Sequence, residues 1–325
     1  MNGEKNNAPK KKRNSIFFRS YFKDGKGVEK NDAIKVDEYN AKNFFKLYFR
    51  RIGNIIKINW IYILGNFPVL FLLLAISGNF SHTAAAPQSQ YYPVIFGMMN
   101  ISENSAALAP MLGIHGIMGS VTSYSVLDYI LLGLSALFIV TFGLVNTGCA
   151  YLERNIVRGE HLFLLDDFFT TVKQNFKQGL IFGIIDLIIL GLSGYSIVFY
   201  IANYNSYFIL FFCSIAVLAF YLFIRQNVYM MLVTFDLPLI KILKNSFILS
   251  SVSLGKNFIA LFAVLLTVFV AFFGSMIFMP IGIIIALMFL FSTGTYIFTY
   301  FTFPKMKEIM IDPYYPNYDK EEAEE

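Results

Sequence analysis

Asp186 is the residue whose type and position best suit chemistry inside a membrane. It lies within the apolar segment Leu180–Tyr200 and is the one ionisable residue well inside such a segment. A charge in hydrocarbon is costly unless it is paired or faces water. Because no Lys or Arg occupies the central part of any apolar segment, the sequence predicts a neutral carboxyl without a counter-ion, which donates a hydrogen bond to a neighbouring helix.

The other candidate residues do not support enzyme chemistry. His82 and His115 have no carboxylate or cysteine at ligand spacing, and His161 falls in a different loop. The stretch Gly191–Gly194 lacks the Lys-Ser/Thr of a phosphate-binding loop and lies in an apolar segment, so helix packing explains it better. Ser193 and Ser275 have no neighbouring His or Lys that would activate them. We therefore expect no enzyme activity, no cofactor, no metal and no nucleic-acid partner.

The most distinctive polar residues lie in the loops after the second and fourth apolar segments. The positions that we single out there are Arg154, Arg158, Gly159, Glu160, Asp167, Phe168, Lys173, Asn175, Phe176, Lys244 and Asn245. In the first loop, Asp166 or Asp167 is placed to cap a helix. In the second, Asp236 is placed to cap one and Pro238 fits its first turn. The sequence predicts a loop turn and one short helix in the first loop, and a second short helix in the other.

Both predicted loop helices carry apolar residues at helical spacing. The expected apolar face of the first is formed by Phe168, Phe169, Val172 and Phe176, with Lys173 and Lys177 pointing elsewhere. The expected apolar face of the second is formed by Leu239, Ile240, Leu243 and Phe247, with Lys241 and Lys244 outside it. Such amphipathic helices lie in the membrane interface, where we place both.

Long apolar segments dominate the chain, which is 56% hydrophobic and 14% charged. A helix needs about 20 apolar residues to cross about 30 Å of hydrocarbon. The segments that reach this length are Ile58–Ser77, Val126–Leu152, Leu180–Tyr200, Tyr207–Met231, Phe258–Phe278 and Ile281–Phe301. The sequence therefore predicts an all-α, polytopic transmembrane helical bundle with about six spans.

Basic residues set the orientation, because loops rich in Lys and Arg stay on the cytoplasmic side. Of the 26 Lys and Arg residues, 15 precede the first span, four lie between the second and third spans, four lie at or between the ends of the fourth and fifth, and three follow the sixth. The three loops on the opposite side have none. Both termini are therefore predicted to be cytoplasmic. Residues 1–40 form a basic tail that we expect to be disordered and to contact lipid headgroups, 41–307 form the transmembrane domain, and 308–325 form an acidic tail.

The longest outer segment, 78–125, contains no Lys or Arg and alternates Ser/Ala/Pro-rich with moderately apolar stretches. It is too short to hold a core of its own. We expect short helices on or in the outer leaflet, broken at glycines. These helices would either pack against the spans or form a lid over an outward-facing cavity.

Polar and small residues within the spans predict bends and close helix contacts. Asn66 and Pro68 mark a bend in the first span. In the second, Gly143 and Gly148 flank Asn146 and mark a place where helices approach closely.

The two cysteines predict no disulfide. Cys149 falls at the cytoplasmic end of the second span and Cys213 near the outer end of the fourth. A bond between them would have to cross most of the membrane. We expect two buried free thiols.

An internal likeness appears when the chain is shifted by 71 residues, which lays Arg154 on Arg225 and Lys173 on Lys244. Each copy reads as an inbound span, an arginine, an amphipathic helix and an outbound span. This order fits two parallel hairpin repeats such as some transporters have. A chance likeness between two ordinary membrane hairpins explains it equally well.

Three stretches resemble the YesL-like family of bacterial integral membrane proteins, a domain of unknown function. They read INWIYILGNFPVLF, RNIVRGEHLFLLDDFFTTVKQNFKQG and YMMLVTFDLPLIKILKNSFILS. The resemblance covers about Ala41 to Lys307, and its most specific part is the turn Arg158–Glu160 with the Asp-Phe and Lys-Gln-Asn-Phe-Lys runs that follow. The outer segment and the long basic N-terminus are additions to the family pattern.

The resemblance implies a protein of the cell membrane of Gram-positive bacteria, encoded alongside ABC-type carbohydrate importers and glycan-degrading enzymes. It implies no catalytic residues. We therefore expect a non-enzymatic accessory or scaffold subunit that contacts membrane lipids and an importer permease through its cytoplasmic loop helices. The alternative is a small secondary transporter built from the two hairpins around Asp186. The sequence indicates neither a substrate nor an oligomeric state.

Overall fold

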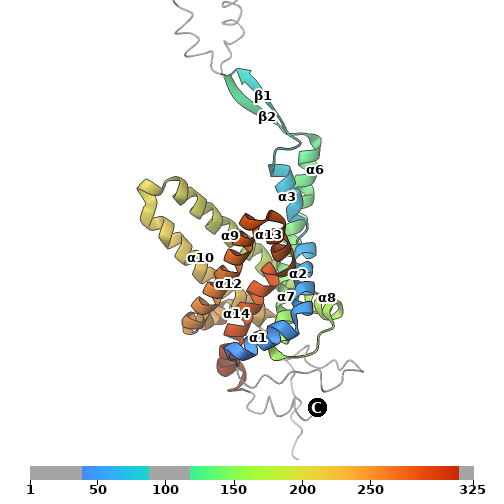
Figure 1. The fold of residues 1–325 in the computed structure, drawn as a ribbon, viewed down its shortest axis with the longest axis vertical. Helices are drawn as coiled ribbons and strands as arrows, with labels where there is room; N and C mark the ends of the chain where they lie inside the picture. The colour runs from blue at the N-terminus through green and yellow to red at the C-terminus, as the bar shows by residue number, and fades with distance from the viewer. Residues whose placement is uncertain (1–38, 88–117, 315–325) are drawn as a thin grey trace, which may run out of the picture. The chain divides into compact units, whose positions relative to one another are not determined.

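The computed structural model describes residues 39–87 and 118–314 of the 325-residue chain (Figure 1). Most of both predicted tails and the middle of the outer segment lie outside the described residues. The chain divides into two compact units. Unit 2 comprises residues 67–138, and unit 1 comprises all the rest.

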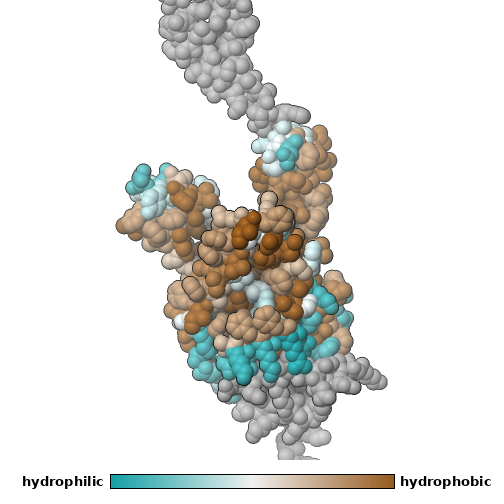
Figure 2. Space-filling view, in the orientation of Figure 1, coloured by the Kyte–Doolittle hydropathy of each residue, from teal (hydrophilic) through white to brown (hydrophobic). Residues whose placement is uncertain are grey.

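Long apolar helices confirm the predicted helical bundle. In the described part of the chain, five helical stretches are long and apolar enough to cross a membrane. The first is Val126–Arg158, which joins α6 (Val126–Ser135) and α7 (Leu137–Arg158). The others are α9 (Phe176–Ala202), α10 (Tyr204–Leu232), α12 (Leu254–Ile277) and the stretch Met279–Ile311. Figure 2 shows a hydrophobic surface on unit 1 that gives way to a hydrophilic band at the end carrying α1 (Ala41–Arg50).

The first predicted span is interrupted. Its halves are α2 (Ile52–Gly65) and α3 (Val69–Ile76), which count as a sixth span if the pair is taken together. The side-chain amide of Asn66 donates to the carbonyl of Tyr62 at 3.0 Å, where α2 ends. Pro68 follows and has no N–H to continue a helix. The predicted break at Asn66 and Pro68 is confirmed.

Glycines let α7 and α9 approach until their backbones touch. A Cβ added at Gly143 would lie 2.2 Å from the carbonyl oxygen of Gly179 and 2.5 Å from the Cα of Gly183. Contacts this close need residues without side chains. The predicted close contact at Gly143 is confirmed, whereas Gly191 and Gly194 have no described atom within 4 Å of an added Cβ, so they do not serve helix packing within the described chain.

The last span contains a π-helical segment that a buried asparagine holds in place. Helix α13 (Met279–Ile285) passes through η2 (Ala286–Leu290) into α14 (Phe291–Met306). The amide of Asn59 donates to the carbonyls of Ala286 and Leu287 at 3.3 and 2.7 Å. Its oxygen accepts from the backbone N–H groups of Phe291 and Ser292 at 2.9 and 3.0 Å. Asn59 therefore supplies hydrogen bonds to backbone groups that the irregular helix would otherwise leave unpaired in hydrocarbon.

In unit 2, helices α3 and α6 pack together, and a β-ribbon connects to them. Strand β1 (His82–Pro87) pairs antiparallel with β2 (Met118–Ser123). Ser125 then starts α6 through a capping box with Asp128. The outer segment was predicted to form short helices. That prediction is wrong at both of its described ends, because these ends pair with each other as strands and so satisfy their backbone groups.

Cys149 is buried and Cys213 is exposed, and both are free thiols. The expected absence of a disulfide is confirmed. The expected burial of Cys213 is wrong, because this part of α10 presents its side chains outward.

Candidate functional site

Asp186 lies at the centre of a polar cluster buried in unit 1. Its side chain is 0% exposed. The Nε of Arg225 donates to its two oxygens at 3.0 and 2.8 Å. The hydroxyls of Tyr221 and Tyr229 donate to one oxygen each, at 2.7 and 2.8 Å. A second guanidinium nitrogen of Arg225 reaches the side-chain oxygen of Asn146 at 3.0 Å. The cluster therefore joins α7, α9 and α10.

The prediction that Asp186 has no counter-ion is wrong. Arg225 lies seven residues before the end of α10 at Leu232, about 10 Å along the helix axis, so the sequence places it near the cytoplasmic boundary. Its long side chain instead reaches the carboxylate on α9. The expected hydrogen-bond donor is therefore an acceptor, because both oxygens of Asp186 accept from Arg225 and from a tyrosine each.

A second acid, Glu153 on α7, is buried with an exposed fraction of 1%. One of its oxygens accepts from the hydroxyl of Thr295 on α14. The other has no hydrogen-bond partner among the described residues. Glu153 could not be recognised as buried from its sequence position, because it precedes Arg154 at the end of a predicted span, where side chains are typically exposed to water.

Arg154 is also buried, but it binds backbone. Its guanidinium donates to the carbonyl of Val233 at 2.6 Å and to the hydroxyl of Thr234 at 3.2 Å. It lies 4.7 Å above the ring of Tyr151. Arg154 therefore fixes the chain that leaves α10 against α7. Its counterpart in the proposed repeat, Arg225, binds a carboxylate instead, so the two arginines have different roles.

The turn Arg158–Glu160 ends α7 in a Schellman motif. Gly159 has a φ of +78°, a left-handed conformation that favours glycine. The N–H of Glu160 donates to the carbonyl of Asn155, and that of Gly159 to the carbonyl of Ile156, both at 3.0 Å. Arg158 and Glu160 form an ion pair at 2.7 Å. The predicted loop turn is confirmed.

The first loop helix is α8 (Leu164–Gln174). The predicted cap by Asp166 or Asp167 is wrong, because the helix begins before them and Phe163 is at its N-cap. Asp167 instead accepts from the backbone N–H of Phe163 at 2.8 Å, from within the first turn. Burial raises the pKa of the Asp167 carboxyl, and this hydrogen bond partly opposes the shift. Phe168 is buried against Gly148, where an added Cβ would lie 2.4 Å from the ring.

The predicted single apolar face of α8 is wrong. Phe168 points inward, whereas Phe169 points outward and Phe176 belongs to α9 and is also exposed. Asn175 ends the helix, with its amide donating to the carbonyl of Thr171 at 3.1 Å, and Lys173 is exposed.

The second loop helix is α11 (Leu239–Val252), preceded by Pro238 as predicted. The predicted cap by Asp236 is wrong, since no side chain in the described chain caps this helix. Its buried face is formed by Ile242, Ser246, Leu249 and Ser250, not by the predicted apolar set. Ile240 and Phe247 of that set point outward, as does Lys244.

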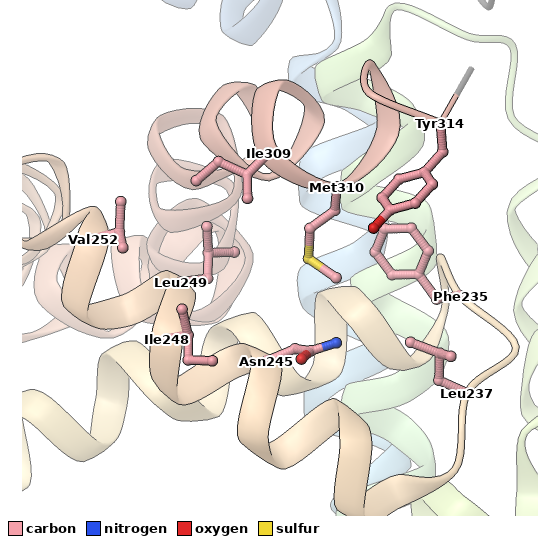
Figure 3. Close-up of a pocket in the computed structure, with 9 residues that line it drawn as sticks. All are labelled: Phe235, Leu237, Asn245, Ile248, Leu249, Val252, Ile309, Met310 and Tyr314. Atoms are coloured by element: carbon pink, nitrogen blue, oxygen red, sulfur yellow. The ribbon is translucent and has the colours of Figure 1, made fainter.

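Between α11 and η3 (Lys307–Ile311) lies a pocket of about 560 Å³. It is lined by Phe235, Leu237, Asn245, Ile248, Leu249, Val252, Ile309, Met310 and Tyr314. Figure 3 shows Asn245, Met310 and Tyr314 pointing toward this space. The pocket is therefore apolar with few polar groups, and one of these comes from Asn245 in the loop motif. It lies at the end of unit 1 predicted to be cytoplasmic.

The structure places the predicted positions in several separate surroundings. Asp186 lies in the buried cluster and Asn245 in the pocket, Arg154 and Phe168 make buried packing contacts, and the remaining loop positions form turns, helix ends and exposed surface. Tyr221, Arg225 and Tyr229, which complete the cluster, were missed. The sequence signal that could have found them is their spacing, because residues four apart on a helix share a face.

Comparison with known proteins gives one family. A family model described as "Protein of unknown function, DUF624" matches residues 112–197. This range runs from the outer segment through α7, α8 and Asp186 on α9. No match is found among curated proteins, and none among solved structures. The chain is therefore a helical membrane protein with a region similar to the DUF624 family.

Proposed function

We propose that this protein is a non-enzymatic accessory subunit of the cell membrane in a Gram-positive bacterium, where it works with an ABC-type carbohydrate importer. Its partner is a permease subunit of that importer, which binds the pocket between α11 and η3. The carbohydrate assignment rests on the resemblance to the YesL-like family, and the way of binding rests on the pocket.

The pocket is the observation that supports this proposal. One recurring mode of recognition between proteins lays the apolar face of a helix in a hydrophobic groove. The pocket between α11 and η3 is mostly apolar, and residues from two separate parts of the sequence line it. Ile248 at its edge is 47% exposed, so an incoming side chain can reach it. A short amphipathic helix of the permease is the kind of segment that such a groove accepts.

The carrier alternative is supported less well by the buried cluster. A proton-coupled carrier built around Asp186 requires this carboxyl to lose and regain a proton or to bind substrate. Both of its oxygens already accept hydrogen bonds from Arg225 and from a tyrosine each. A fully paired carboxylate between three helices serves better as a structural tie than as an exchanging site.

Affinity purification from crosslinked native membranes tests the proposal. We expect the wild-type protein to recover importer permease subunits in near-stoichiometric amount, as measured by mass spectrometry. Ile248→Asp places a charge in the pocket and should abolish recovery. Ile240→Asp is the matched control, because Ile240 lies on the same helix, is 81% exposed and does not line the pocket.

Three outcomes would contradict the proposal. One is clean recovery of the protein alone under conditions that hold a known complex together. Another is equal permease recovery with both aspartate variants, which would move the contact away from the pocket. The third is uptake activity by the protein reconstituted alone, which would favour the carrier.

A further inference from the structure

Helix α1 has two faces with different tasks. Its inner face packs on α14, where Leu47 is 1% exposed and the ring of Phe44 lies 5.3 Å from that of Tyr296. The hydroxyls of Tyr296 and Tyr300 donate to the carbonyls of Phe44 and Asn40 at 3.2 and 2.9 Å. This face fixes α1 across the end of the bundle (Figure 1).

The outer face of α1 combines aromatic and basic side chains. Phe45 and Phe49 are 55% and 63% exposed, and their rings lie 6.2 Å apart. Lys42, Lys46 and Arg50 are exposed and share this face at helical spacing. The helix has no acidic residue. Five exposed positions therefore present only hydrocarbon and positive charge.

We infer that this face of α1 is a binding surface for anionic phospholipid headgroups. The inference is independent of the proposed importer partner. A helix with basic and aromatic side chains on its exposed face lies in the plane of the membrane interface, with its aromatic rings at the acyl boundary. The ammonium and guanidinium groups of Lys42, Lys46 and Arg50 bind lipid phosphates.

Charge complementarity favours lipid over a protein partner as the occupant. Arg51 follows α1 directly and Lys57 lies on the next helix, α2, so the positive charge continues beyond α1. Helix α1 has no acidic residue that would attract a basic protein surface. The helix that carries these side chains is also held in place, because the inner face of α1 is anchored on α14 by two hydrogen bonds to backbone. A surface ordered in advance loses little entropy when it binds.

Native mass spectrometry of the full chain, with phosphatidylglycerol or phosphatidylcholine added, tests this inference. The triple variant Lys42→Gln, Lys46→Gln, Arg50→Gln should lose its preference for phosphatidylglycerol, by roughly fivefold in apparent affinity for each basic residue removed. The matched control removes three exposed lysines elsewhere on the predicted cytoplasmic side. It consists of Lys173→Gln, Lys177→Gln and Lys244→Gln, and should keep most of the preference.

A second variant tests the aromatic part. Phe45→Ser with Phe49→Ser removes two exposed rings that contact each other and the half-buried rings of Phe44 and Tyr48 but lie outside the core. The protein should therefore fold, but binding to vesicles of either lipid should weaken equally. An unchanged phosphatidylglycerol preference in the α1 triple variant would overturn the inference, as would an equal loss in the control variant. Protection of α1 by another protein in native membranes, with no lipid preference, would assign the face to that protein instead.

Discussion

Removing Asp186 tests the buried cluster most sharply. Asp186→Asn keeps the shape and one acceptor oxygen but leaves the Arg225 cation without its carboxylate. Removing one partner of a buried ion pair destabilises a protein by about 3–5 kcal/mol. Arg225 is 14% exposed and Asp186 is 0% exposed, so we expect a loss near the lower limit, about 3 kcal/mol. For a chain of this size such a loss lowers the unfolding temperature by roughly 6–12 °C.

The double variant Asp186→Asn, Arg225→Gln separates charge from packing. It removes both charges together and leaves two amides that can bond to each other, so it should be more stable than Asp186→Asn alone. Thermal unfolding of all four proteins of the cycle in one detergent gives the coupling energy. The reasoning fails if Asp186→Asn unfolds at the wild-type temperature, or if the losses of the two single variants simply add in the double variant.

The other predictions use the same thermal unfolding assay. Gly143→Ala should destabilise the protein by about 2 kcal/mol, because the new methyl meets the α9 backbone. Its control, Gly191→Ala, has no described atom near the new methyl and should be neutral or stabilising. Equal effects of the two substitutions would contradict the packing role of Gly143. Asn59→Ala should lower the stability of the protein by about 2 kcal/mol, because it leaves backbone groups at η2 without their hydrogen bonds. Its control, Asn203→Ala, breaks only an exposed bond to the carbonyl of Phe199 and should have little effect. An Asn59→Ala variant as stable as the wild type would contradict the role assigned to Asn59. Glu153→Gln replaces a buried carboxyl, one of whose oxygens has no hydrogen-bond partner in the described chain, with a neutral amide of the same shape, so the unfolding temperature should stay level or rise. A fall of several degrees would mean that the acid is needed.

Hydrophobic patterning was enough to predict the architecture. Segments of about 20 apolar residues located the spans, and Asn66 with Pro68 located the interruption between α2 and α3. Small residues located the contact at Gly143. These features follow from local sequence, because the bilayer fixes the length of a span and close packing requires glycine.

The polar interior could not be predicted, because it depends on which helices become neighbours. Arg225 looked cytoplasmic by its distance from the end of α10, but only the packing of α9 against α10 brings it to Asp186. Asn59 could not be linked to η2, which lies more than 220 residues later. The apolar faces of α8 and α11 were assigned wrongly because Phe and Ile suit lipid and protein equally. Composition does not separate these two surroundings in a membrane protein.

A photocrosslinking amino acid placed at Asn245 tests the proposed docking pocket most directly. Asn245 lines the pocket and is half-buried, so it reports on what enters there. After irradiation of native membranes, we predict one dominant adduct at Asn245 that contains a permease subunit of a carbohydrate importer. The same amino acid at Ile240, on the same helix but outside the pocket, should give only lipid or diffuse products. A crosslink at Asn245 to lipid alone, or no difference between the two positions, would contradict the account.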